Sequence, residues 1–231
     1  MKNPIFKLSN LVYSHKNSNL MNIKNFEIHR GACYIINGNM GSGKTLLLDI
    51  LSKQNKNYKG DVFYESKEIS SYSNKNFNKD VYYVKQSFSP PYFKNVEQFL
   101  NSVSRNNSLA KNKSKNLDSL ISKMDFKYLV NNKMRELTPS QLRWVNLAAG
   151  LASFPKVLLI DELELHLGSN NMKILSKLLF RKSNYEGITI IATTQNKELF
   201  KNLSSVNINL NNGRITSVRS NAKRNYSKKN K

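Results

Sequence analysis

The sequence GNMGSGKT at residues 38–45 decides the fold, because it matches the phosphate-binding loop pattern G-x-x-x-x-G-K-[ST]. An apolar run, Ala32 to Ile36, precedes this loop, and a helix-like run, Leu46 to Leu51, follows it. A buried strand that ends in a glycine-rich turn before a helix directs backbone N–H groups toward an anion. The sequence therefore predicts a phosphate site at the end of a strand.

Every residue of this loop is expected to contact a bound nucleotide: Gly38, Asn39, Met40, Gly41, Ser42, Gly43, Lys44 and Thr45. We expect Lys44 to bind the β- and γ-phosphates and to take part in catalysis, and the Thr45 hydroxyl to bind Mg²⁺. The alternative interpretation is a glycine turn without a ligand. Motifs elsewhere in the chain are needed to distinguish it from a nucleotide-binding loop.

The length of 231 residues and the 39% hydrophobic content are enough for one core with a small subdomain attached. No apolar stretch approaches the ~20 residues that span a bilayer, and the N-terminal sequence lacks the apolar segment of a signal peptide. We therefore expect a cytoplasmic protein. Cys33 is the only cysteine, which excludes an internal disulfide and suits a reducing compartment, so it is most simply a core thiol.

The formal net charge of +22 invites a nucleic-acid interpretation, because a strongly basic surface attracts polyanions. The lysines, however, are spread along the chain and interleaved with asparagines, so we expect no nucleic-acid partner. Basic residues crowd only in a tail at residues 221–231, which is expected to be disordered. This tail could contact anionic lipid headgroups at about 1 kcal/mol per basic residue, although a merely solvated tail is the favoured alternative.

Strands and helices alternate along most of the chain. Two antiparallel strands are expected between Phe6 and Ile28, and a hairpin around Asn212-Gly213 is expected at residues 206–218. Further strands are expected at Cys33–Asn37, 60–66, Val81–Lys85, Val157–Ile160 and Ile188–Ala192, and helices at Pro139–Ser153 and Met172–Phe180. Near-continuous apolar strands between helices predict an α/β fold with a mostly parallel sheet covered on both faces, after an N-terminal antiparallel region.

The segment from Phe88 to Glu136 differs from this pattern. Strand-like runs are missing there, and helical periodicity is found at residues 96–103 and 117–130, separated by a polar linker at Arg105–Asn116. We interpret the segment as an inserted α-helical subdomain, which extends to about residues 88–155 when the following helix is included.

A second motif supplies the acids that a phosphate loop needs for hydrolysis. Residues 157–162 read VLLIDE, so Asp161 and Glu162 follow an apolar strand. Asp161 can hold Mg²⁺ opposite Thr45, and Glu162 can act as general base on the attacking water. The alternative is that two acids after a strand only begin a turn or a helix; the phosphate loop favours the catalytic interpretation.

These motifs, in this order, resemble the ATP-binding subunit of an ABC (ATP-binding cassette) transporter over residues 5–218, and Gln86 in VYYVKQSF matches the Q-loop glutamine of that family. The resemblance implies a P-loop NTPase core in a single domain of residues 1–220. It also implies Mg²⁺ and catalytic roles for Gln86, ATP and Mg²⁺ as cofactors, and ATP hydrolysis coupled to transport. The implied partners are an integral membrane permease subunit and a second ATPase subunit, at the inner face of the cell membrane.

The signature segment of this family, usually L-S-G-G-Q, is matched by Leu137-Thr138-Pro139-Ser140-Gln141. The resemblance implies that Thr138, Ser140 and Gln141 contact ATP bound to the facing subunit. Pro139 removes a backbone donor there and Ser140 adds a side chain. The same residues read as a capping box, with Thr138 as N-cap and Gln141 as its N3 partner, so a helix should still begin here with its positive end toward the anion.

Two other family positions differ in this chain. Gln195 stands where the family has its switch histidine, and it can hydrogen-bond a γ-phosphate or water but cannot carry a proton. Gly168 stands where the family has an aspartate that links the two subunits' sites. The aromatic residue that stacks on adenine is matched by His15 on spacing, with Tyr13 on the same strand face, and either ring could stack.

Three smaller signals carry alternatives. Glu162, Glu164 and His166 resemble a metal cluster, but solvated acids are the favoured interpretation, and Trp144 is expected in the core. Tyr92 and Phe93 lie either near the membrane subunit or in a hydrophobic plug of the subdomain.

The sequence thus leads to a transport ATPase subunit as the first hypothesis. The altered signature, Gly168 and Gln195 motivate a second, a degenerate regulatory ABC ATPase that binds ATP with little turnover or serves a non-transport partner.

Overall fold

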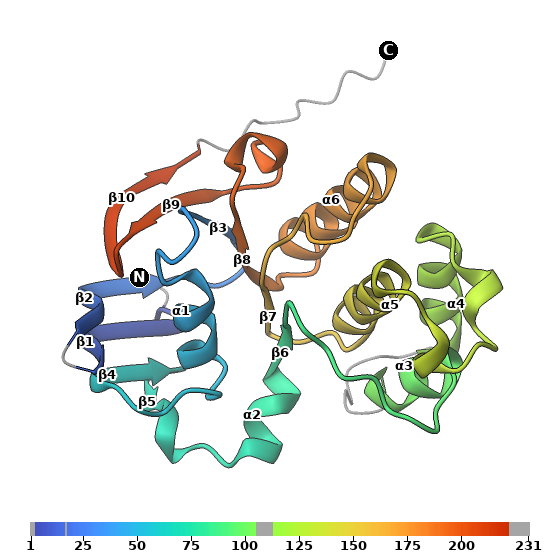
Figure 1. The fold of residues 1–231 in the computed structure, drawn as a ribbon, viewed down its shortest axis with the longest axis horizontal. Coiled ribbons are helices and arrows are strands. Elements are labelled where there is room, and N and C mark those ends of the chain that lie inside the picture. The colour runs from blue at the N-terminus through green and yellow to red at the C-terminus, as the bar shows by residue number, and fades with distance from the viewer. Residues whose placement is uncertain (1–2, 17, 105–112, 222–231) are drawn as a thin grey trace.

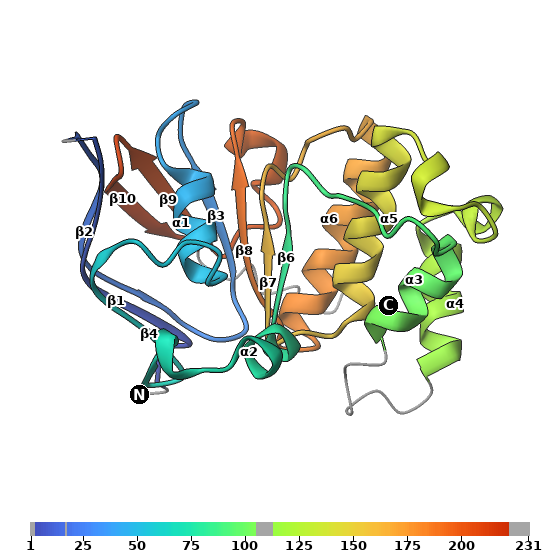
Figure 2. The same ribbon diagram turned by 60° about the horizontal axis from the view of Figure 1, so that its bottom comes forward.

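A computed structural model of the chain describes residues 3–16, 18–104 and 113–221. It contains two β-sheets and a set of helices that are stacked in layers (Figures 1 and 2). In Figure 2 the layers follow one another from the antiparallel sheet through helix α1 (Lys44–Leu51) and the larger sheet to the remaining long helices. The expected α/β fold is confirmed.

The larger sheet has the strand order β10-β9-β3-β8-β7-β6. Its strands are β3 (Cys33–Asn37), β6 (Val81–Val84), β7 (Val157–Ile160), β8 (Thr189–Thr194), β9 (Val206–Asn211) and β10 (Arg214–Ser220). β3 pairs in parallel with β8 and β9, and β7 pairs in parallel with β6 and β8, whereas β10 is antiparallel to β9. The predicted mostly parallel sheet is therefore present, and the carboxyl ends of its central strands meet at one edge.

The smaller sheet is antiparallel, as expected for the N-terminal region, and has the order β2-β1-β4-β5. Its strands are β1 (Phe6–His15), β2 (Ser18–Ile28), β4 (Lys59–Tyr64) and β5 (Lys67–Glu68). The buried face of this sheet and α1 share one hydrophobic core with Tyr34 and Ile36 of β3. The intervening β3 residues, Cys33 and Ile35, belong to a second core on the other face, as the two-residue period of a strand requires.

The second core lies under the helical layers. Helices α5 (Pro139–Ala152) and α6 (Ser169–Asn184) cover the larger sheet, and α3 (Val96–Ser104) and α4 (Lys113–Lys123) lie beyond them (Figure 2). Trp144 of α5 is buried here, and its indole Nε1 donates a hydrogen bond to Met124 O over 2.8 Å. The core positions predicted for Trp144 and Cys33 are confirmed.

The capping box at the start of α5 is confirmed in both directions. Thr138 Oγ1 accepts a hydrogen bond from Gln141 N at 3.3 Å, and Gln141 Oε1 accepts one from Thr138 N at 3.0 Å. Pro139 occupies the first helical turn, where a missing N–H costs nothing. The altered signature segment therefore still begins a helix, because it forms a complete capping box.

Several boundaries differ from the sequence expectation. Residues 67–79, which the sequence left without assignment, include β5, a 3₁₀ turn η1 (Ile69–Ser71) and helix α2 (Asn74–Asp80), whose cap Ser73 Oγ accepts a hydrogen bond from Asn76 N. The apolar pattern of residues 117–130 is not one helix, because Asp125 takes a positive φ of 53° after α4. The remaining 3₁₀ turns are η2 (Lys127–Leu129), η3 (Met134–Glu136) and η4 (Lys197–Phe200).

The C-terminal hairpin supports the phosphate loop. Its turn residues Asn212 and Gly213 both have positive φ, as the tight hairpin turn predicted for them requires. Gly213 N donates to Ser42 O and Gly213 O accepts from Asn22 N, each at 2.9 Å. A Cβ at Gly213 would lie 2.1 Å from Leu20 O, so only glycine lets the hairpin tip enter between β2 and the loop.

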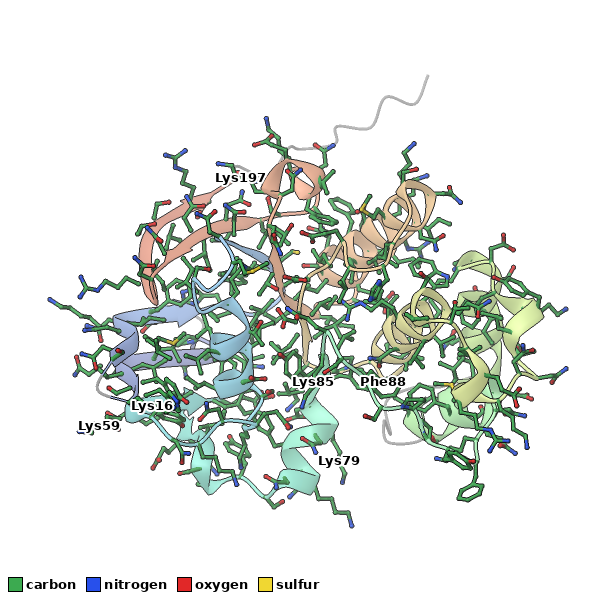
Figure 3. The ribbon with its side chains drawn as sticks, viewed as in Figure 1. Lys16, Lys59, Lys79, Lys85, Phe88 and Lys197 are labelled. Atoms are coloured by element: carbon green, nitrogen blue, oxygen red, sulfur yellow. The ribbon has the colours of Figure 1, made fainter. Side chains whose placement is uncertain are left out.

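Cationic side chains are distributed around the molecule. Lys16 and Lys59 are labelled close together at the antiparallel sheet in Figure 3, whereas Lys79 and Lys197 lie at two other places. The basic tail at residues 222–231 is outside the described residues. Within the described ranges, every helix is too short or too polar to cross a bilayer. The division into residues 1–220, with a subdomain at about 88–155, stays a prediction.

Candidate nucleotide-binding and catalytic site

The predicted phosphate loop connects the end of β3 to the start of α1. Gly43 caps this helix with a φ of 98°, and no described side chain caps the first-turn N–H groups. A Cβ at Gly38 would lie 2.3 Å from Leu210 O, because β9 packs directly against the loop. The helix therefore begins with free backbone donors, which is the arrangement that binds an anion.

The side chains of the loop are also arranged for a phosphate. Lys44 is buried, and its Nζ bends back to donate to Gly38 O at 2.6 Å and Asn39 O at 2.9 Å. Ser42 Oγ is buried without a hydrogen-bond partner among residues 3–16, 18–104 and 113–221. The Lys44 ammonium and the Ser42 hydroxyl, beside the free N–H groups of the helix start, are suited to bind a phosphate group. Met40, in contrast, is 87% exposed.

Three residues predicted as Mg²⁺ ligands come together beside the loop. Thr45 Oγ1 donates to Asp161 Oδ2 at 2.8 Å, and Gln86 Nε2 donates to Thr45 Oγ1 at 3.4 Å. They come from α1, from the segment after β6 and from the end of β7, so the parallel sheet brings them to one edge. A hydroxyl, an amide and a carboxylate form the oxygen-donor set that Mg²⁺ prefers.

Glu162 and Gln195, the two other predicted catalytic residues, also meet. Gln195 Nε2 donates to Glu162 Oε1 at 2.8 Å. Glu162 has a φ of 50°, so the chain turns sharply after Asp161 and directs the two adjacent carboxylates to different partners. The sequence order Asp-Glu thus gives two acids with separate surroundings.

Thr193 is a site residue that the sequence analysis missed. It is fully buried in β8, where its Oγ1 donates to Asp161 Oδ1 at 2.6 Å and accepts from Glu162 N at 2.7 Å. The signal was a hydroxyl residue in a fully buried strand, because such a group needs a hydrogen-bond partner.

Glu164 was expected to be a solvated acid, and this expectation is wrong. Its Oε1 accepts from Thr194 Oγ1 at 2.9 Å and from Gln195 N at 2.8 Å, and its Oε2 is buried without a partner in the described part of the chain. The chain after β7 folds back against the end of β8, which covers this side chain. His166 is exposed, and the residues that the structure describes contain no group of three or more His, Cys, Asp or Glu side chains that could hold a metal ion.

Arg143 of α5 is the second missed residue. Its Nη1 donates to Lys85 O at 2.6 Å, and its Nη2 donates to Asp161 O at 2.6 Å and Glu162 O at 2.8 Å. Burial lowers the pKa of Arg143 to about 10, against the opposing effect of nearby carboxylates, so it remains a cation at neutral pH. A charge on an amphipathic helix ordinarily faces water, which is why the sequence pattern did not single it out.

Among the described residues, no hydrogen bond joins the residues predicted for the signature and adenine contacts to the phosphate loop. Thr138 and Ser140 are exposed at the start of α5, where Gln141 completes the capping box. His15 is exposed at the end of β1, and Tyr13 is half-buried against the antiparallel-sheet core. Their nucleotide contacts stay predictions.

Tyr92 and Phe93 lie on the surface, 59% and 87% exposed, with the Arg135 guanidinium 4.5 Å from the Tyr92 ring centre. The alternative that they plug the helical subdomain is therefore wrong.

The fold, the phosphate loop and the acids after β7 agree with one family. The ABC transporter family model matches residues 21–164 of the chain. The chain belongs to this family. It is an ATP-binding protein of the ABC ATPases, whose members hydrolyse ATP as a general property.

Relatives and solved structures agree with this assignment. The uncharacterized ABC transporter ATP-binding protein MJ1508 of Methanocaldococcus jannaschii is 30% identical over 203 residues, which cover 84% of this chain and 88% of the relative. The methionine import ATP-binding protein MetN of Clostridioides difficile is 29% identical, covering 83% of this chain and 61% of the relative. The dimeric ATP-binding cassette MJ0796, solved in a post-hydrolysis state with ADP and Pi, superimposes with a TM-score of 0.78 at 20% identity, covering 93% of this chain and 98% of that structure, and shows the shared ABC fold.

Proposed function

We propose that this chain is the ATP-hydrolysing subunit of a membrane transporter, and that it works as a dimer bound to a separate permease subunit at the inner face of the membrane. The observation that carries the proposal is the meeting of Thr45, Gln86 and Asp161 beside the phosphate loop, with Glu162 next to them. The relatives' names, which include import ATP-binding proteins, support the permease partner.

The substrate is Mg-ATP, and each group of the site has a defined task. The first-turn N–H groups of α1, Lys44 and Ser42 bind the phosphates, and Lys44 exchanges its two backbone carbonyl partners for phosphate oxygens. Thr45, Gln86 and Asp161 hold Mg²⁺, which supplies positive charge against the transferred phosphoryl group. Met40, Asn39 and Gly41 line the exposed side of the loop.

Glu162 is the general base in this proposal. Its carboxylate accepts a hydrogen bond from Gln195 and therefore has a fixed direction before substrate binds. Gln195 orients this carboxylate and a water molecule without carrying a proton. His15 or Tyr13 stacks on the adenine ring.

The site is completed by a second subunit. Thr138, Ser140 and Gln141 start α5, and the helix N-terminus that they cap presents backbone donors and a positive dipole end toward ATP of the facing chain. Pro139 reduces the number of donors, so this half of the site contributes less than a glycine-rich segment does. A partner ATPase subunit with its own signature segment would complement it.

The test separates the ATPase from a regulatory protein with little turnover. The purified chain is assayed for ATP binding and hydrolysis alone and co-expressed with candidate permease subunits, beside Glu162→Gln and the exposed control Glu198→Gln. We expect wild type and Glu198→Gln to hydrolyse ATP and co-purify with a permease, and Glu162→Gln to bind ATP with turnover reduced at least about 100-fold. Tight binding with negligible turnover in every preparation would favour the regulatory alternative, and unchanged turnover in Glu162→Gln would exclude its role as base.

A further inference from the structure

The guanidinium of Arg143 connects three parts of the site that are far apart in the sequence. It belongs to α5, and it bonds the carbonyls of Lys85, Asp161 and Glu162. Lys85 directly precedes Gln86, and it lies with Phe88 on the stretch that runs from the end of β6 toward the helical layer (Figure 3). One side chain therefore holds the segments that carry the metal ligands and the base.

The burial of this cation indicates a requirement for it. Arg143 is 4% exposed, and its Nε has no hydrogen-bond partner among the described residues, so the group is desolvated and not fully satisfied. A buried charge is costly unless it is paired and hydrogen-bonded. The nearby charges that favour the cation are the acids after β7, namely Asp161, Glu162 and Glu164.

Two of the carbonyls bonded by Arg143, those of Asp161 and Glu162, lie at an irregular turn. β7 ends at Ile160, and Glu162 takes a positive φ of 50°, a conformation that few residues with a side chain adopt. Bonds to the carbonyls on both sides of this turn oppose its relaxation. A planar guanidinium can reach several acceptors at once, which a lysine ammonium on a flexible stem does less well.

The helix that carries Arg143 begins at the signature segment. Arg143 follows Gln141 by two positions, so the capped end of α5 and the guanidinium lie within the first turns of one rigid helix. Any displacement of this helix is passed directly to the carbonyls of Lys85 and Glu162.

From these contacts we infer that Arg143 is a positioning residue that ties the signature helix to the segments of Gln86 and Glu162, so that seating of α5 against a facing nucleotide fixes the geometry of the base. The expected effect on ATP turnover rests on the proposed function. Arg143 touches neither substrate nor metal in this assignment; it acts through the backbone of residues that do.

The kinetic test uses Arg143→Gln, Arg143→Lys and the exposed control Arg181→Gln of α6. We expect Arg143→Gln to lower kcat roughly 10- to 100-fold, as a small misplacement of a catalytic group does, with the equilibrium constant for ATP binding changed less than about 3-fold. Arg143→Lys should recover part of the loss, and Arg181→Gln should match wild type. Equal loss of kcat and of ATP binding, or wild-type kcat in folded Arg143→Gln, would overturn the inference.

A second measurement is independent of turnover, so failure of the inference can be told from failure of the proposed function. Amide hydrogen exchange is followed in the ATP-free variants. We expect Arg143→Gln to lose protection at residues 161–165, whose backbone N–H groups are hydrogen-bonded at 161, 162, 163 and 165, by at least about 10-fold, while α1 and β3 keep theirs. Uniform loss over the chain would show a general structural role, and no loss would show that Arg143 does not hold these segments; either result would overturn the inference. Should Arg143→Gln fail to fold, Arg143→Lys is used for both measurements, and wild-type kcat together with wild-type protection at residues 161–165 would overturn the inference.

Discussion

Gln195 and Glu162 lie 33 positions apart, and the amide Nε2 of the first donates a hydrogen bond to Oε1 of the second at 2.8 Å. The backbone N–H of Gln195 also donates to Glu164 Oε1. One residue at the end of β8 therefore restrains two acids that follow β7. Because an amide does not titrate, the donor side of this restraint does not change with pH.

The first prediction concerns that restraint. Gln195→Ala should lower ATP turnover about 10-fold while ATP affinity stays within about 3-fold, because the base loses its fixed direction and the phosphate contacts remain. The measurement is kcat and the binding constant side by side, with the remote Gln98→Ala as control. Loss of affinity larger than the loss of kcat would assign Gln195 to nucleotide binding instead.

A second prediction places a titrating group at the same position. Gln195→His should add an inflection near pH 6.5 to the pH profile of kcat, because an unperturbed imidazole changes charge there. Wild type should lack this inflection, since its side chain has no proton to lose. Superimposable profiles of the two proteins would mean that residue 195 does not contact the reacting groups.

Lys44 provides the third prediction. Lys44→Ala should weaken ATP binding about 10- to 150-fold, the equivalent of roughly 1.5–3 kcal/mol for a charge-assisted hydrogen bond. The control is Lys16→Ala, which removes an equal charge at an exposed site. Equilibrium titration with ATP gives the ratio, and equal weakening by both variants would assign the effect to the overall charge.

The metal set gives the fourth prediction. Chelation of Mg²⁺ should abolish turnover, and Asp161→Asn should require at least about 10-fold more Mg²⁺ for half-maximal activity, because a hard cation prefers a carboxylate. Asp118→Asn, on α4, serves as the matched control. A wild-type Mg²⁺ requirement in Asp161→Asn would remove this residue from the metal site.

Gly150 of α5 leads to a prediction about stability. A Cβ there would lie 2.9 Å from Leu158 Cδ1, so the crowding of about 1–3 kcal/mol should exceed the roughly 0.5–1 kcal/mol that alanine adds to a helix. Gly150→Ala is therefore expected to lower the free energy of unfolding in urea. Gly168→Ala, where no atom lies within 4 Å and φ is ordinary, should lower it less, because alanine there loses only the N-cap preference for glycine.

Cys33 is expected to resist thiol reagents. Burial raises the pKa of its thiol, so the folded protein holds it neutral and enclosed. At pH 8 the reaction of Cys33 with a thiol reagent should be at least about 1,000-fold slower in the folded protein than in denaturant. This ratio corresponds to an unfolding free energy of roughly 5 kcal/mol, because only unfolded molecules expose the thiol. In the unfolded chain the thiol ionises once the pH exceeds its ordinary pKa of about 8.5. Because the folded protein keeps the thiol neutral, the free energy of unfolding should fall as the pH rises past about 8.5.

Much of the fold could be predicted because its signals are local. The phosphate loop, the capping box at Thr138 and the turn at Asn212-Gly213 each depend on a few adjacent residues. The parallel strands β3, β7 and β8 of the larger sheet were found because burial on both faces leaves an apolar run. Residues 67–79 were left unassigned because their only cap signal, Ser73, precedes a polar helix with one buried residue, Phe77.

Part of the site could not be predicted, because it depends on contacts between distant segments. Thr193 and Arg143 acquire their roles from where β8 and α5 pass the end of β7, which no sequence window contains. Glu164 was misjudged for the same reason: its partners are Thr194 and Gln195, on another strand. A sequence motif predicts its ligand well when adjacent backbone groups themselves form the binding site, as they do in residues 38–45.

The hydrogen bond from Gly213 N to Ser42 O has a consequence for biosynthesis. A chain under synthesis leaves the ribosome with its amino end first, so the segment of residues 38–45 emerges long before the hairpin of β9 and β10. Until that hairpin docks, the loop lacks both the Gly213 amide and the Leu210 carbonyl that packs against Gly38. The nascent protein therefore gains its capacity to bind ATP only after residues 206–220 have been synthesised and β9 and β10 have joined the sheet.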